Sequence, residues 1–328
     1  MNRQRGAALL MVLLILAIMA ALAAKMTLQF QSTWQTQMFL LNQQQLQWLA
    51  HDAEQIAIQK LRRDLKDTPQ NNNLNQSWAQ TGETDNEDGS AVNYVIVDGQ
   101  ACFNINSLQQ NQPDSVTKEE PYNTRVLRQL LIDAGSNRAE TERFVDSLSD
   151  YLDIDDQVRS AGAESKEYKK QATSGSAVKH EIYSLNELAL LPDFPREIVA
   201  QIRNQLCVLP EETQQINVNT LAEAQAPLLS AMFLGEITTD DAKKILTARP
   251  LNGWNSVDLF LQEVKKQRFT IAPDFAAIKP LLTVRSRFFT LYSQGSTGDQ
   301  KNTMSSSLFF NKDDSSIKIY QRRYRILE

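Results

Sequence analysis

The chain has 328 residues, of which 42% are hydrophobic, and this length is enough for two or more domains with their own cores. The hydrophobic fraction excludes an intrinsically disordered chain. The formal net charge of −5 argues against a nucleic-acid-binding protein, which would usually be basic.

The first segment has the charge pattern of a membrane anchor. Arg3 and Arg5 precede an apolar run, residues 7–24, that contains no charged or polar side chain. This run is near the lower limit for crossing a bilayer, and it becomes long enough when it extends to Leu28 with Lys25 snorkelling. By the positive-inside rule the N-terminus stays in the cytoplasm and the bulk of the chain lies across the membrane.

A cleaved secretory signal peptide is the alternative, because residues 21–23 (Ala-Leu-Ala) fit a small-x-small cleavage site. Two features favour the anchor. The apolar run begins directly after Gly6, and residues 7–68 contain neither Gly nor Pro, so the helical pattern continues past that site.

The apolar run is predicted to continue as an amphipathic helix. Apolar residues recur mostly every three or four positions up to Leu65, and residues 67–69 (Asp-Thr-Pro) end the pattern. The helix would be roughly 90 Å long, with residues 7–28 in lipid and residues 29–68 outside.

Strand patterns enclose a helical block. Residues 70–90 are polar and predict a loop, and residues 91–97 and 101–105 flank Asp98-Gly99, which predicts a β-hairpin. Helical patterns follow at 124–134, 138–152, 196–206, 221–234 and 240–248. Strand patterns return at 284–293, 307–311 and 316–327. This order predicts an α+β fold in which an all-α domain is inserted into a β-sheet.

The helical block contains a degenerate repeat. Residues 104–108 (Asn-Ile-Asn-Ser-Leu) match residues 217–221 (Asn-Val-Asn-Thr-Leu), and two later pairs of short segments match in the same order, 184–188 with 256–260 and 192–194 with 273–275. The pattern predicts two copies of a small helical module, residues 107–209 and 210–282.

The first module contains an acidic stretch, residues 150–164. With Asp153 as position 1, Asp155 and Glu164 fall at positions 3 and 12 of an EF-hand loop, but Val158 stands where that loop needs Gly. Acidic residues at a helix C-terminus oppose the helix dipole, which favours a bound cation over the alternative of a solvated loop. The candidate ligands of an irregular calcium site are Asp150, Asp153, Asp155, Asp156 and Glu164.

Other chemical signals are few. Cys102 and Cys207 predict a disulfide in an oxidising compartment, with two buried thiols as the alternative. His51 and His180 have no zinc-type neighbours, and no phosphate-binding or nucleophile motif occurs, so no enzyme is predicted. Residues 318–325 interleave basic and aromatic side chains, which fits an edge strand protected by charge better than a nucleic-acid site.

The basic leader ending in Gly6, the directly following apolar helix and its amphipathic continuation resemble a type IV pilin-like prepilin. In that family prepilin peptidase cleaves after the Gly, which makes residues 1–6 the leader and Ala7 the first mature residue. The helical insert, the acidic stretch ending in Gly162-Ala-Glu164 and residues 217–220 are similar to the type II secretion minor pseudopilin K family over essentially the whole chain.

The resemblance implies a non-enzymatic subunit at the tip of a periplasmic pseudopilus, held in the inner membrane by a single span. Its fold would be type IV pilin-like, with a long helix on an antiparallel sheet from residues 69–106 and 283–328. The insert, residues 107–282, would bind calcium and consist of sterile-alpha-motif or helix-hairpin-helix-like modules that read no nucleic acid. The implied partners are minor pseudopilins I and J, with minor pseudopilin H, the major pseudopilin G, the assembly platform including protein L, and prepilin peptidase as further candidates.

Two positions depart from the general pilin pattern. Ala7 stands where pilins have Phe, which leaves its N-methylation open. Met11 stands at mature position 5, where the Glu of an incoming pilin pairs with the N-terminal amine of the subunit already in the filament. The pairing matters because an unpaired amine in lipid is costly. The first subunit to assemble has no earlier subunit whose amine it could pair with, so a subunit without this Glu suits that position. The alternative for Met11 is an ordinary apolar residue of a membrane helix.

Two other functions stay open at this point. One is a DNA-uptake pilin-like protein that uses the helical repeat as helix-hairpin-helix units. The other is a periplasmic hydrolase with a signal anchor, for which the sequence contains no site.

Overall fold

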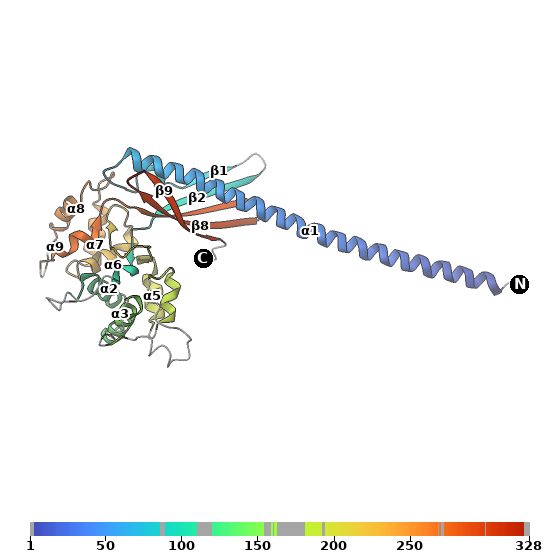
Figure 1. Ribbon diagram of the computed structural model, residues 1–328, viewed down its shortest axis with the longest axis horizontal. Coiled ribbons are helices and arrows are strands. Elements are labelled where there is room, and N and C mark those ends of the chain that lie inside the picture. The colour runs from blue at the N-terminus through green and yellow to red at the C-terminus, as the bar shows by residue number, and fades with distance from the viewer. Residues whose placement is uncertain are drawn as a thin grey trace.

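The structure, a computed structural model, describes residues 3–85, 89–109, 120–153, 159, 161–162, 181–191, 194–267, 269, 272–298 and 300–324. A long N-terminal helix projects from a body in which its C-terminal part packs on a sheet, and a block of short helices lies at the end of the body away from the N-terminus (Figure 1).

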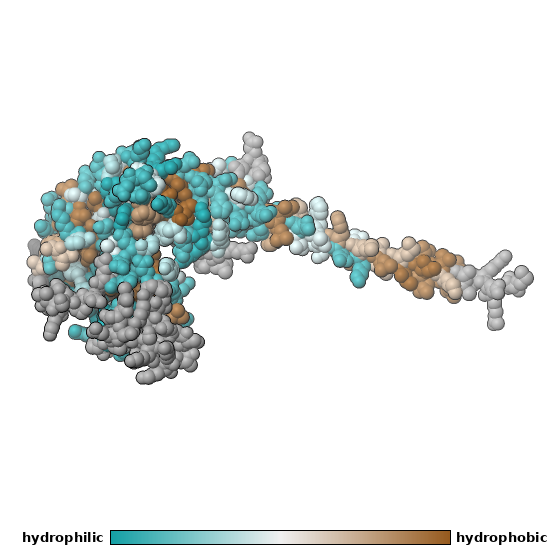
Figure 2. All heavy atoms as spheres, viewed as in Figure 1, coloured by the Kyte–Doolittle hydropathy of each residue, from teal (hydrophilic) through white to brown (hydrophobic). Residues whose placement is uncertain are grey.

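The projecting helix, α1 (Arg3–Asp67), confirms the long helix predicted from the absence of Gly and Pro. Residues 9–24 of this helix are exposed and apolar (Figure 2). In its second half, buried side chains recur every three or four residues and face the sheet: Leu46, Ala50, Ala53, Ala57, Leu61 and Leu65. Gly295 allows the helix to approach closely, since a Cβ there would lie 2.7 Å from the Leu46 carbonyl oxygen.

Five antiparallel strands form the sheet in the order β1-β2-β7-β8-β9. The strands are β1 (Gly82–Asp85), β2 (Ser90–Asp98), β7 (Phe288–Thr297), β8 (Gln300–Asn311) and β9 (Ser316–Tyr324). β2 and β7 pair along their full shared length although the helical block separates them in the sequence. This confirms an insertion between neighbouring strands. The insertion is mainly helical rather than all-α, because it also contains two short pairs of parallel strands. β9 lies at the sheet edge as predicted.

Two sequence predictions in this region are wrong. The predicted hairpin does not form, because β3 (Phe103–Asn104) leaves the sheet and pairs in parallel with β4 (Leu206–Cys207). The Asp98 side chain accepts a hydrogen bond from the Gln100 backbone N–H at 2.8 Å, and this local turn directs the chain into the helical block. The predicted loop 70–90 contains the 3₁₀ turn η1 (Ser77–Ala79) and β1, and its Trp78 packs in the core under α1.

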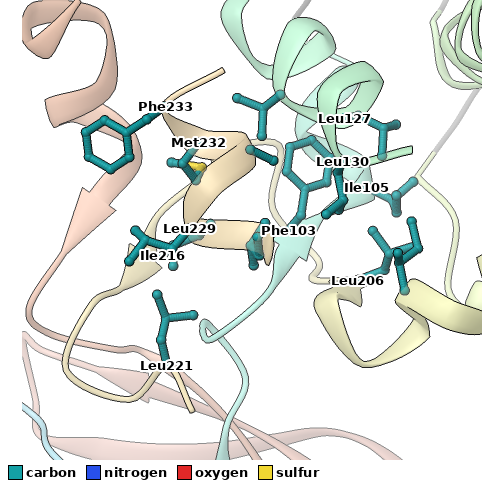
Figure 3. Close-up of a cluster of buried hydrophobic side chains, with 14 of the residues drawn as sticks. Phe103, Ile105, Leu127, Leu130, Leu206, Ile216, Leu221, Leu229, Met232 and Phe233 are labelled. Atoms are coloured by element: carbon teal, nitrogen blue, oxygen red, sulfur yellow. The ribbon is translucent and has the colours of Figure 1, made fainter. Parts of the chain in front are cut away.

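The helical block comprises short α-helices and 3₁₀ turns around a shared core. The α-helices are α2 (Tyr122–Asp133), α3 (Arg138–Leu152), α5 (Arg196–Ile202), α6 (Ala226–Met232), α7 (Thr239–Thr247), α8 (Val257–Val264) and α9 (Phe275–Ile278). The 3₁₀ turns are η2 (Ile105–Leu108), η3 (Leu185–Leu190), η4 (Arg203–Gln205), η5 (Glu223–Gln225) and η6 (Lys279–Leu281). One apolar cluster joins Phe103 and Leu130 of the first half to Leu229 and Phe233 of the second, so the two halves do not have separate cores (Figure 3).

The two copies of the sequence repeat use equivalent hydrogen bonds. The Asn106 side chain pairs with both backbone groups of Ile182, and the Asn219 side chain pairs in the same way with Trp254. Each clamped residue stands two positions before the next matching segment of its copy. β5 (Ile216–Asn217) and β6 (Leu282–Thr283) pair in parallel, as β3 and β4 do.

A buried carboxylate fastens α1 to the sheet. Glu54 is fully buried and accepts two hydrogen bonds from the Arg322 guanidinium, each at 2.9 Å, and one from the Ser306 hydroxyl. Burial alone would raise the pKa of Glu54, but the hydrogen bonds from Arg322 and Ser306 bring this pKa below its ordinary value of 4.5.

We predict that Glu54→Gln lowers the free energy of unfolding by about 2 kcal/mol at pH 7, because it removes charge-assisted hydrogen bonds from a buried site. Since the folded-state pKa is depressed, the stability that Glu54 contributes is present above pH 4.5 and is lost as the pH falls through the folded-state pKa. Urea unfolding at pH 7 and pH 3.5 measures both effects. The control is Glu142→Gln, an exposed helix pair with Arg138 that should change stability by a few tenths of a kcal/mol. Equal losses in the two variants at pH 7 would contradict the prediction.

Candidate functional sites

The projecting part of α1 is the first candidate site. It is long and apolar enough to cross a membrane, and Met11 within it is 67% exposed. Gly6 and Ala7, the predicted cleavage residues, lie in the helical backbone, and their side chains are outside the described ones. This helix therefore presents an apolar surface that no other described part of the chain covers.

An exposed apolar stripe continues along α1 beyond the candidate span. Trp34, Leu41 and Trp48 are 59%, 58% and 70% exposed, and their spacing of seven residues puts them along one side of the helix. Residues two positions apart on a helix point to nearly opposite sides, so Trp48 faces away from Leu46, which packs on the sheet. We call these three residues the outer stripe. Large apolar side chains at this spacing are typical of a surface that packs against another helix.

The joint between the sheet and the helical block centres on Asp98 at the end of β2. Its buried carboxylate accepts hydrogen bonds from the Thr220 hydroxyl at 2.7 Å, the Asn217 amide at 2.9 Å and the Ser286 hydroxyl. Burial raises the pKa of Asp98, and the hydrogen bonds from Ser286 and Thr220 offset part of this rise. The joint therefore connects three places in the chain: the end of β2, residues 217–220 in the middle of the helical block, and Ser286 just before β7.

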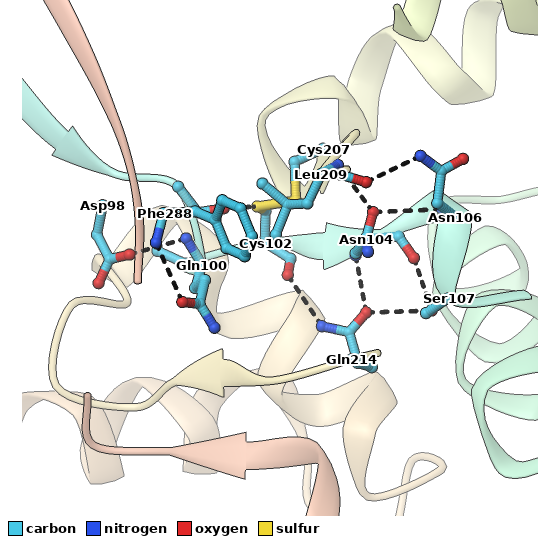
Figure 4. The surroundings of a disulfide bond; sticks show 12 residues. Asp98, Gln100, Cys102, Asn104, Asn106, Ser107, Cys207, Leu209, Gln214 and Phe288 are labelled. Atoms are coloured by element: carbon cyan, nitrogen blue, oxygen red, sulfur yellow. Dashed lines mark hydrogen bonds between the residues drawn. A yellow bond between two sulfur atoms is a disulfide. The ribbon is translucent and has the colours of Figure 1, made fainter. Parts of the chain in front are cut away.

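Cys102 and Cys207 form a disulfide, with Cα atoms 5.7 Å apart, which confirms the predicted pairing. The bond closes a loop between sequence positions 105 residues apart and lies beside the buried Asn104 and Gln214 side chains (Figure 4). It fastens the beginning of the helical block to the end of its first half.

The acidic stretch begins on the last turns of α3. The Arg159 guanidinium lies between Asp150 and Asp153 and contacts an oxygen of each carboxylate at 2.5 Å. Burial raises the pKa of Asp150, and the hydrogen bonds from Arg159 offset part of the rise. A Cβ at Gly162 would lie 1.9 Å from Asp150 Oδ2, so the glycine of the Gly-Ala-Glu motif permits this close approach.

The residues of the acidic stretch have the carboxylate chemistry that suits calcium. The structure brings Asp150 and Asp153 together, while Asp155, Asp156 and Glu164 lie outside the described residues. Within the described ranges, no three His, Cys, Asp or Glu side chains gather where they could hold a metal ion. Carboxylate oxygens are the ligands that Ca²⁺ prefers. In the described structure the positive charge beside Asp150 and Asp153 comes from the Arg159 guanidinium. Arg159 was not among the predicted site residues, because no local sequence signal shows that its side chain folds back onto α3.

Comparisons with known proteins identify relatives of the whole chain. Two family models match, both described as type II secretion system protein K, over residues 101–211 and 216–285. A putative type II secretion system protein K of Escherichia coli K12 is 36% identical over 99% of both chains. The type II secretion system protein K of Klebsiella pneumoniae is 35% identical over 99% of this chain and 98% of its own length.

A solved structure supports the same relationship. In the GspK-GspI-GspJ complex from the type 2 secretion system of enterotoxigenic Escherichia coli, the matching chain gives a TM-score of 0.75 at 26% identity. The match covers 88% of this chain and 98% of that chain. It confirms the type IV pilin-like α+β fold that the sequence predicted.

Proposed function

The chain belongs to the type II secretion system protein K family, and we propose that it is a non-enzymatic minor pseudopilin at the tip of the secretion pseudopilus. The observation that carries the proposal is the likeness to a chain solved in a complex of GspK, GspI and GspJ. In this role it starts pseudopilus assembly with minor pseudopilins I and J, and it supports export of folded proteins across the outer membrane. The DNA-uptake alternative is not favoured, because the relatives are named as secretion components.

Processing and membrane insertion are part of the proposal. The apolar part of α1 spans the inner membrane, the bulk lies in the periplasm, and prepilin peptidase removes residues 1–6. After cleavage, Met11 occupies mature position 5 without a carboxylate, which suits a subunit that enters the filament first. Its exposed side chain is compatible with lipid and with a packed filament core.

We predict that N-terminal sequencing of the protein from its native membrane gives Ala7 as the first residue. A Gly6→Leu variant should keep residues 1–6, because the family's peptidase cleaves after Gly. A start at Ala24 or Lys25 would instead establish the signal-peptide interpretation and overturn the anchor.

The outer stripe is proposed to contact the long helices of minor pseudopilins I and J. We predict that Trp48→Ala weakens the complex at least about 30-fold, since truncation of an aromatic hot spot costs about 2 kcal/mol or more. Pull-down and titration of the full chain with the two partners in detergent measure this change.

The matched control is Leu251→Ala, which removes a 78% exposed apolar side chain from the helical block. No association of the parent protein with the partners would count against the tip role. Equal weakening by both variants would show that the outer stripe has no special part in the contact.

Calcium binding is proposed for the acidic stretch, with Asp150, Asp153, Asp155, Asp156 and Glu164 as the residues that would hold the ion. The bound ion would add positive charge at the C-terminal end of α3. There the negative end of the helix dipole repels the carboxylates, and a cation would offset this repulsion. Arg159 would hold the two carboxylates at the beginning of the stretch in place.

We predict that chelation with EGTA lowers the melting temperature of the parent protein by several degrees, because a ligand at 100 times its Kd stabilises by about 2.7 kcal/mol. The double variant Asp155→Asn with Glu164→Gln should melt at the same temperature with and without calcium. These positions avoid the two carboxylates that Arg159 engages. Glu223→Gln, an exposed carboxylate on η5, should respond as the parent does. An unchanged melting temperature of the parent on chelation would exclude the site.

A further inference from the structure

A cleft of about 330 Å³ lies between the helical block and the outer face of the sheet. This face carries the side chains that alternate with those packed on α1. Tyr183 and Arg203 line the cleft from the helical block, and Tyr292, Tyr320 and Arg323 line it from β7 and β9. Pockets between two parts of a fold are common places for binding.

The walls of the cleft are tied together. The disulfide Cys102–Cys207 lies in its lining, next to Leu209 and Phe288 (Figure 4). The Arg323 guanidinium donates a hydrogen bond to the Tyr183 carbonyl oxygen at 2.8 Å, which joins the sheet to the helical block. A cleft fixed in this way loses little conformational freedom when it takes up a ligand.

The cleft carries positive charge on two arginine side chains, and the Glu187 carboxylate near them accepts a hydrogen bond from the Tyr183 backbone N–H at 2.8 Å. Arg203 donates to the Asn186 side-chain oxygen and Arg323 to the Tyr183 carbonyl oxygen, and within the described part of the chain neither one forms an ion pair with an acid. Of the described residues that line the cleft, only Asp98 is acidic, and its carboxylate is buried in the joint and hydrogen-bonded there. The cleft therefore carries two guanidinium groups and a set of tyrosine rings in a chain whose net charge is −5.

The surplus of positive charge continues next to the cleft. The Tyr320 ring contacts Phe288 at 6.1 Å between centroids, and the Arg287 guanidinium lies over the Phe288 ring at 5.8 Å. Burial lowers the pKa of Lys312, and the neighbouring charges of Arg285 and Arg287 lower it further. Three cations are thus close together, and Glu211 pairs with Arg287 among them.

We propose that this cleft, with the adjoining cations just before β7 and just after β8, binds an extended acidic segment of a partner protein. Guanidinium groups bind carboxylates through paired hydrogen bonds, and tyrosine rings provide flat contact surfaces at low entropic cost. β9, which lines the cleft, is an edge strand, and edge strands take up extended segments through main-chain hydrogen bonds. The lining of the cleft contains none of the residues of the outer stripe, so the two proposed contacts can be tested separately.

The test uses the full chain in detergent micelles and a fluorescein-labelled octapeptide of alternating Glu and Ala, with a Gln-for-Glu octapeptide as its counterpart. Fluorescence anisotropy at low and high salt gives the affinities. We expect the Glu peptide to bind at least about tenfold more tightly than the Gln peptide, and to weaken with salt. The variant Arg203→Gln with Arg323→Gln should lose at least about tenfold in affinity, whereas Arg203→Lys with Arg323→Lys should lose less because the charge remains.

A charge-matched control is Arg196→Gln with Lys301→Gln, which removes one exposed cation from the helical block and one from the sheet outside the cleft. It should bind the Glu peptide as the parent does. Circular dichroism melting checks that each variant is folded, and if the double Gln variant melts early, the two single Gln variants replace it. Absence of binding, equal affinity for both peptides, equal loss in the control, or preferential binding of a thymidine oligonucleotide would each overturn the proposal.

Discussion

The buried carboxylate of Asp98 determines how two separate parts of this chain are held as one body. Burying a carboxylate costs several kcal/mol unless hydrogen bonds replace its water. Here the donors come from the turn after β2, from the middle of the helical block, and from Ser286, which lies 188 residues further along the chain. Because the same group receives all of them, β2 and β7 can pair in register although a whole domain is inserted between them.

The two sides of α1 differ in the size of their side chains and in what they contact. Small alanines and Gly295 let the inner side approach the sheet, and the pairing of Glu54 with Arg322 fixes the helix there. Among the described residues the outer stripe has no comparable ion pair to the sheet, and it consists of two tryptophans and a leucine that are more than half exposed. A helix that was bound equally on all sides could not leave the membrane and join a filament, so this asymmetry is what the proposed function requires.

Local sequence signals predicted part of this structure well. The limits of α3 were predicted at the residues observed, and α1 follows from a stretch without Gly or Pro. The hairpin prediction was wrong because a turn signal at Asp98 cannot show that the next strand of the sheet lies far along the chain. The strand β1 was missed because it is short and polar, and the role of Arg159 because its contacts with α3 are tertiary. The disulfide was predicted from the compartment and is confirmed. Calcium binding and all five of its proposed ligands remain predictions.

The paired asparagines of the repeat have a consequence for how such a domain changes over evolutionary time. Asn106 holds a residue 76 positions away, and Asn219 holds its counterpart only 35 positions away, with the same hydrogen bonds. The geometry of each clamp is thus independent of the length of chain between its two ends. A segment can be lengthened there without moving the core, and the first copy accommodates its acidic stretch in this interval. If such a unit is duplicated and the segment between the two ends of one clamp is then lengthened, the core keeps its structure. The added loop can then acquire a new role.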